Sequence, residues 1–134
     1  MLVSNSFNRN LEDTLDFNSS YSYFSPALLK KYAAASLEKD TLFWIGDSAA
    51  YPRQSFYFYP QLCSSYLMPD SLPAKVLAEK GIPSVPIALS YPWGKGEIIL
   101  VSTPLLFTNY GVLDGKNATY IFRLLSQMGD LPIV

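Results

Sequence analysis

The sequence predicts a mixed α/β domain, in which a mixed sheet contains an antiparallel hairpin and a helix closes the chain. Three observations predict this class. Glu97–Ser102 holds four consecutive aliphatic residues, which is typical of a strand covered on both faces. The connection from the preceding strand-like segment, Val85–Tyr91, is too short for a crossover, so the two strands should pair antiparallel. Residues 114–129 then carry apolar residues at the spacing of an amphipathic helix.

The N-terminal third is expected to alternate short elements with loop. Residues 1–7 are predicted to form a short strand. Residues 8–20 are rich in Asn, Asp and Ser, which favours a loop, with a short strand at 14–18 as an alternative for part of it. A helix is expected from Ser25, which can cap it, to about residue 37, with Pro26 in its first turn.

The middle of the chain is expected to supply more strands. An apolar run predicts one at 41–46, and alternating aromatic residues predict another at 55–59, with a loop between them. Residues 60–73 contain three prolines and show no clear period. Residues 74–80 favour a helix by propensity. Because Gly81 and Pro83 follow at once, we prefer a hairpin of 75–79 with 84–91.

The last element is the strongest predicted helix. Asp114 lies near its start and Gly129 lies just past its end. The residues predicted to form its apolar face are Ala118, Ile121, Phe122, Leu125 and Met128.

The length of 134 residues predicts one domain, 1–134. A hydrophobic fraction of 49% and a charged fraction of 16% indicate a chain rich in core residues. The chain begins on strand-like Leu2-Val3 and ends on Leu131–Val134, so we expect a fragment of a longer protein.

Composition argues against several classes of function. The net charge is −1 and the ten Lys and Arg are scattered, so no nucleic-acid partner is expected. No apolar run is long enough for a membrane helix, so the fragment is expected to be soluble and without membrane contact of its own. The single cysteine, Cys63, and the absence of histidine predict no metal site, and no cofactor is expected. The sequence indicates no oligomeric state.

Gly94-Lys95-Gly96 suggests a phosphate-binding loop, but its context favours another interpretation. The spacing of a P-loop is missing, and the glycines precede a strand rather than a helix. We therefore interpret the segment as a hairpin turn in which glycine takes positive φ.

Polar residues follow the central strand and form the candidate ligand site: Ser102, Thr103, Thr108 and Asn109. In open α/β sheets, ligands bind where strands end. The alternative is that Pro104 ends the strand while Thr108 and Asn109 bond to the loop backbone.

Two further features bear on function. Six tyrosines (Tyr51, Tyr57, Tyr59, Tyr66, Tyr91 and Tyr110) and Trp93 can stack on sugars or on a protein partner, or they are half-buried sheet residues with hydroxyls in water. The chain has no histidine, so neither Ser–His–Asp nor Cys–His catalysis can be assembled within it. No catalytic residue is therefore assigned.

From Gly94 the sequence resembles a known family. The pattern is Gly94-Lys95-Gly96, a hydrophobic strand, Ser102-Thr103-Pro104, Phe107-Thr108-Asn109, and Asn117 opening the last helix. It resembles the C-terminal part of an uncharacterised bacterial domain-of-unknown-function family related to class I glutamine amidotransferase-like domains, over roughly residues 84–128. The resemblance implies a flavodoxin-like or amidotransferase-like layered fold, membrane anchors outside these residues, and no established catalysis.

These observations favour a non-catalytic interaction or ligand-binding domain of a membrane-anchored bacterial envelope protein, with a protein partner in the envelope. One alternative is a carbohydrate-binding module that uses exposed Tyr and Trp. Another is half of an enzyme whose catalytic residues lie upstream of Met1, for which an upstream strand ending in a Cys or Ser nucleophile would be the decisive finding.

Overall fold

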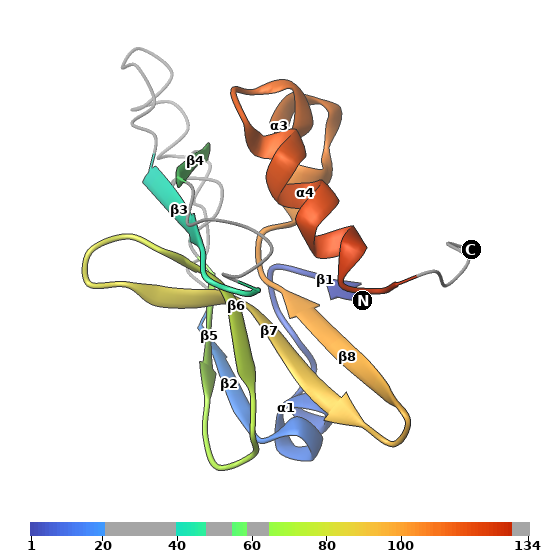
Figure 1. Cartoon of the computed structure of the whole chain (residues 1–134). Helices are drawn as coiled ribbons and strands as arrows, with labels where there is room; N and C mark the ends of the chain where they lie inside the picture. The colour runs from blue at the N-terminus through green and yellow to red at the C-terminus, as the bar shows by residue number, and fades with distance from the viewer. Residues whose placement is uncertain (21–39, 48–54, 59–64, 130–134) are drawn as a thin grey trace.

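The computed structural model describes residues 1–20, 40–47, 55–58 and 65–129, and the described strands build one large and one small sheet (Figure 1). The large sheet has six strands in the order β1-β8-β7-β6-β3-β4. The mixed α/β class is confirmed, because β1 runs parallel to β8 while the other pairings in this sheet are antiparallel. Its strands in chain order are β1 (Leu2–Val3), β3 (Asp40–Trp44), β4 (Ser55–Phe58), β6 (Lys75–Lys80), β7 (Val85–Trp93) and β8 (Gly96–Val101).

The centre of this sheet is the antiparallel meander β6-β7-β8, which confirms the predicted hairpins. Trp93 pairs with Gly96, so only Gly94 and Lys95 form the turn between β7 and β8. Gly94 has φ +60°, the left-handed value that a type II′ turn requires at its first central position. The hairpin interpretation of Gly94-Lys95-Gly96 is therefore confirmed.

Strand β8 is covered on both faces, as its aliphatic run predicts. Ile99 and Val101 belong to one buried cluster and Leu100 to another. The first cluster includes residues of the last helix, and the second includes residues from the N-terminal helix and the small sheet. In Figure 1, α3 and α4 accordingly lie on the opposite side of β7 and β8 from α1, β2 and β5.

Residues 8–20 are not the predicted loop, and the short strand expected at 14–18 lies slightly later, at Phe17–Ser20. They form helix α1 (Arg9–Leu15) followed by strand β2 (Phe17–Ser20). The Asn8 side chain caps the helix by accepting a hydrogen bond of 2.7 Å from the Asn10 N–H. Asp16 ends it with φ +52°. The polar residues of this segment favour a loop in the sequence. In the structure they cap α1 at both ends or lie on its exposed face, while Leu15 is buried.

The small sheet pairs two segments that are far apart in the sequence. β2 runs antiparallel to β5 (Tyr66–Pro69), with Phe17 opposite Pro69 and Ser20 opposite Tyr66. A strand of only four residues is too short to show a clear alternation of apolar and polar residues, and the partner of β5 lies about fifty residues upstream. The sequence of 60–73 therefore does not predict β5. This pairing brings α1 over the β7–β8 end of the large sheet, where Leu15 and Tyr91 share one core cluster.

The C-terminal region contains more helical segments than the predicted one. A 3₁₀ turn (Pro104–Phe107) and helix α3 (Asn109–Leu113) precede α4 (Asn117–Ser126). Gly129 lies three residues past the end of α4, with φ +63°, so its predicted position just past the helix is confirmed.

The predicted apolar face of the last helix is partly wrong. Phe122 is 70% exposed, while the buried positions of α4 are Asn117, Tyr120, Ile121, Arg123 and Leu124. The buried stripe at spacings of three and four starts from a polar residue, Asn117, which donates from Nδ2 to the Gly111 carbonyl at 3.0 Å. Leu125 and Met128 pack against the core from the edge of this stripe.

The predicted strands at 41–46 and 55–59 correspond to β3 and β4. The predicted helix from residue 25 to 37, most of the predicted loop at 47–54 and Cys63 lie outside the described residues. In the described part of the chain, no helix has the length and apolar character needed to cross a bilayer.

Candidate functional site

The four predicted site residues fall into two pairs with different surroundings. Ser102 and Thr103 are fully buried at the end of β8. The Ser102 hydroxyl lies 3.2 Å from the Ile87 carbonyl and 3.3 Å from the Ser65 carbonyl, so it bonds to backbone. The Thr103 hydroxyl is buried without a hydrogen-bond partner.

Thr108 and Asn109 lie beyond the 3₁₀ turn, and both are exposed. Thr108 caps α3, because its hydroxyl accepts from the Gly111 N–H at 3.2 Å and donates to the Leu105 carbonyl at 2.7 Å. The backbone-bonding alternative is thus confirmed for Thr108. No hydrogen bond in the described ranges joins these residues to Ser102 or Thr103, and a ligand role for the four stays a prediction.

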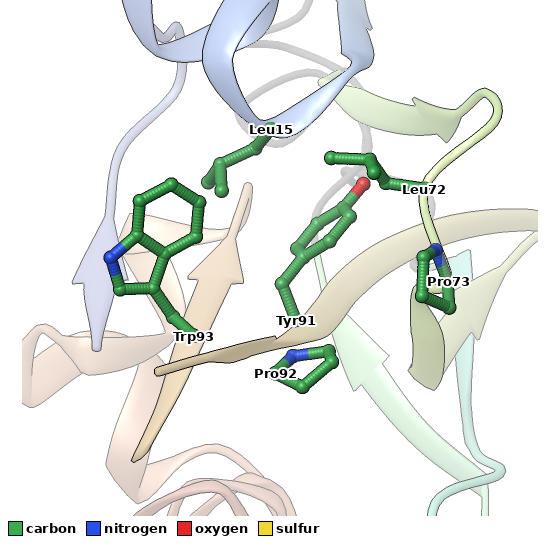
Figure 2. Close-up of a pocket in the computed structure, with 6 residues that line it drawn as sticks. All are labelled: Leu15, Leu72, Pro73, Tyr91, Pro92 and Trp93. Carbon is green, nitrogen blue, oxygen red and sulfur yellow. The ribbon is translucent and has the colours of Figure 1, made fainter. Parts of the chain in front are cut away.

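A pocket of about 200 Å³ opens at the other end of the sheet, beside the β7–β8 turn (Figure 2). Three parts of the chain build it: the end of α1, the turn between β5 and β6, and the end of β7. The residues that line it are Leu15, Leu72, Pro73, Tyr91, Pro92 and Trp93.

Two aromatic residues of β7 supply the polar atoms among these lining side chains. Tyr91 and Trp93 are two positions apart in a strand, so both side chains point to the same face of the sheet. Trp93 is 51% exposed and Tyr91 only 2%. The Tyr91 ring packs against the Phe17 ring, at a distance of 6.4 Å between the ring centroids. The prediction that the tyrosines keep their hydroxyls in water is therefore wrong for Tyr91.

The Tyr91 hydroxyl is buried and has no hydrogen-bond partner. Buried polar groups are nearly always paired, so an orphan at the edge of a pocket is unusual. Burial raises the pKa of Tyr91, and the negative charge of Asp16 raises it further. The phenol therefore stays neutral near pH 7 and can act as a hydrogen-bond donor.

Asp16 holds the far wall of the pocket in place. Its carboxylate accepts hydrogen bonds from the Ser71 hydroxyl and, at 3.1 Å, from the Ser71 N–H. Its main-chain carbonyl accepts from the Asp70 N–H at 3.0 Å. These bonds tie the turn that carries Leu72 and Pro73 to the end of α1. The bond from the Ser71 hydroxyl is the main cause that lowers the pKa of Asp16 below its ordinary value of 3.8.

Replacing Asp16 by asparagine is expected to remove a pH-dependent part of the stability. Because the folded-state pKa lies below 3.8, the contribution is present above that pH and is lost as the pH falls through the folded-state pKa. The melting temperatures of wild type and Asp16→Asn should therefore differ at neutral pH and converge in acid. Asparagine tolerates the left-handed backbone at this position.

The matched control is Asp13→Asn, which removes an exposed carboxylate from the same helix. A difference between wild type and Asp16→Asn that stays constant from neutral pH to strong acid would contradict the role of the Asp16 carboxylate.

Comparison with known proteins adds one finding. Residues 62–125 match the model of a family described as a domain of unknown function, DUF4350. The DUF4350 match covers slightly less than half of the chain and begins upstream of the expected resemblance at 84–128. It confirms a domain of unknown function in this region. No significant match was found among curated proteins or among solved structures.

The DUF4350 match runs from just before β5 to the last turn of α4. It includes every lining residue of the pocket except Leu15. Tyr91 and Trp93 stand out in the sequence as aromatic residues, but their neighbours in the pocket do not. Leu15, Leu72 and Pro73 are ordinary apolar residues in the sequence, and only the β2–β5 pairing brings them to β7.

Proposed function

We propose that this chain is a non-catalytic ligand-binding or interaction domain and that its binding site is the pocket between Tyr91 and Trp93. The observation that carries the proposal is the neutral, largely apolar lining with one buried and unpaired hydroxyl. Binding pockets combine apolar walls with a few placed polar groups in this way.

The chemistry of the lining supports binding rather than turnover. Tyr91 is the only ionisable residue that lines the pocket, and its raised pKa keeps it protonated near pH 7. The chain contains no histidine that could act as a general base.

The wider context is part of the same proposal. From the resemblance at Gly94–Asn117, we infer that the domain belongs to a membrane-anchored bacterial envelope protein related to amidotransferase-like domains, with a protein partner in the envelope. Expression of the full-length open reading frame followed by membrane fractionation tests this: recovery in the soluble fraction would contradict it.

A turnover screen tests the absence of catalysis. The purified chain should show no hydrolase or transferase turnover above that of a heat-denatured sample. Turnover that is lost in Asn109→Ala or Ser102→Ala would contradict the proposal. Asn109 is the sharper of the two positions because it is exposed, whereas Ser102 is buried and its variant requires a check of folding.

A carbohydrate-binding module is the second candidate, and the half-exposed Trp93 at the pocket favours it. Glycan-array binding should then be lost in Trp93→Ala and kept in Phe122→Ala, which removes another exposed aromatic ring from a helix of the opposite layer. A blank array would remove this candidate.

A further inference from the structure

The size of the pocket limits what it can hold. Pockets for whole small-molecule ligands measure about 300–1,000 Å³. This pocket, at about 200 Å³, is smaller and opens to solvent beside Trp93. It therefore suits one ring or one branched side chain of a longer ligand, which continues across the surface.

The hydrogen-bonding groups of the pocket limit the ligand further. Tyr91 offers an unpaired hydroxyl, which can donate or accept a hydrogen bond. The indole nitrogen of Trp93 lies on the side of its ring away from Tyr91 and Leu15 (Figure 2). The neighbouring Asp16 carboxylate is occupied by Ser71. No charged side chain lines the pocket. The complementary ligand is therefore neutral and mostly apolar, with a polar group that can bond to the Tyr91 hydroxyl.

The spacing of the two aromatic residues matches an extended peptide. Residues two apart in a strand lie about 6.6 Å from each other along the strand. Residues two apart in a polyproline II helix lie about 6.2 Å apart. Proline residues in that helix present carbonyl acceptors and no N–H donor, and such segments dock on surfaces lined by aromatic residues.

A sugar ring fits this lining less well. Its hydroxyl groups would face the side chains of Leu15, Leu72 and Pro73, which cannot form hydrogen bonds. Burying a hydroxyl without a partner is unfavourable. A proline ring places carbon atoms against the same walls.

We propose that the pocket between Tyr91 and Trp93 binds an extended, proline-containing peptide segment of a protein partner, with a peptide carbonyl accepting a hydrogen bond from the Tyr91 hydroxyl. This inference rests on the proposed function. In Figure 2 the hydroxyl points toward Leu72, which is 41% exposed, so the proposed bond requires the Leu72 side chain to move aside when the peptide binds.

The test is a titration of the whole chain with a capped hexaproline peptide, with a capped glycine–serine peptide of equal length as the control. Of the two tryptophans, Trp44 is 1% exposed and Trp93 51%, so acrylamide quenching reports mainly on Trp93. Saturable protection from quenching by hexaproline alone is expected. In Trp93→Ala, heteronuclear NMR should show that binding is lost, while Phe122→Ala binds normally.

Tyr91→Phe separates binding from structure. The variant keeps the ring against Phe17 and removes a hydroxyl that has no partner in the free protein, so its melting temperature should equal or exceed that of wild type. Its affinity for hexaproline should fall about tenfold, the effect of one lost hydrogen bond. Unchanged affinity in Tyr91→Phe, or hexaproline binding that survives Trp93→Ala, would overturn the inference.

Other outcomes tell the two proposals apart. If a glycan binds in a way that depends on Trp93 and hexaproline does not bind, the peptide proposal is wrong, but the proposal of a ligand-binding domain stands. Self-association that perturbs the pocket residues in NMR spectra and that Ile82→Asp abolishes would instead assign the pocket to a second copy, which would insert this side chain. Ile82 is 98% exposed on the β6–β7 turn, and this outcome would likewise overturn the peptide proposal. If neither peptide, glycan nor second copy perturbs the pocket residues in NMR spectra, the proposed binding site itself is wrong.

Discussion

Replacing Leu124 by alanine is expected to lower the free energy of unfolding by about 2–5 kcal/mol, the usual cost of truncating a fully buried leucine. Leu124 is 0% exposed and lies in the core cluster that joins α4 to the sheet. The same cluster holds Tyr120, whose ring meets that of Trp44 edge-on at a centroid distance of 6.3 Å. Loss of Leu124 therefore loosens the contact between the helix and the sheet.

Phe122→Ala is the matched control, since it truncates a larger apolar side chain on the same helix. Phe122 is 70% exposed, so its removal should change stability by no more than about 0.5 kcal/mol. Urea denaturation followed by circular dichroism measures both variants. If Phe122→Ala costs as much as Leu124→Ala, the apolar face predicted from the sequence is right and the structural one is wrong.

Gly111→Ala is expected to destabilise the chain by about 3 kcal/mol, near the upper end of the usual cost of overpacking. A Cβ at this position would lie 2.2 Å from the Leu105 carbonyl oxygen and 2.6 Å from the Leu106 Cα. Both atoms are backbone of the preceding 3₁₀ turn, so no side-chain rotation relieves the clash. The turn, or the start of α3 that Thr108 caps, must move instead.

Gly96→Ala is the control for this change. It makes the same substitution in β8, where the added Cβ has only the Trp93 carbonyl oxygen near it, at 3.8 Å. Both variants lose similar freedom in the unfolded chain, so their difference isolates the clash. At about 4 °C per kcal/mol for a domain of this length, thermal unfolding should separate them by roughly 12 °C. Equal melting temperatures would show that the Gly111 contact is not tight.

The elements that sequence reasoning placed correctly are those with a strong local signal. The β8 strand is a continuous aliphatic run preceded by its own turn, and Gly94 takes the positive φ that its position in that turn requires. Gly81 and Pro83 interrupt the segment and favour a hairpin of β6 and β7 over a helix, and the antiparallel pairing confirms the hairpin. Such signals act over a few residues and need no knowledge of distant partners.

The predictions from sequence are wrong where polar residues have structural roles. Asn8 and Asp16 are typical of a loop by residue type, but they begin and end α1. Asn117 is polar and so lies outside the predicted apolar face of α4, but its side chain is 1% exposed and bonded to the Gly111 carbonyl. A polar side chain can form a hydrogen bond with a backbone group and so cap a helix or lie buried. Polarity alone therefore predicts the wrong element at α1 and the wrong face of α4.

By itself, the sequence determined the mixed α/β class, the antiparallel meander and a C-terminal helix, because turn chemistry and apolar period are local properties. Only the tertiary structure decided the pairing of β2 with β5, the buried face of α4 and the position of the pocket. The pocket needs Leu15, Leu72 and Tyr91 at one place, although they lie far apart in the chain. Their meeting depends on burial of shared apolar surface, a non-local term that outweighs the weak propensities of short segments.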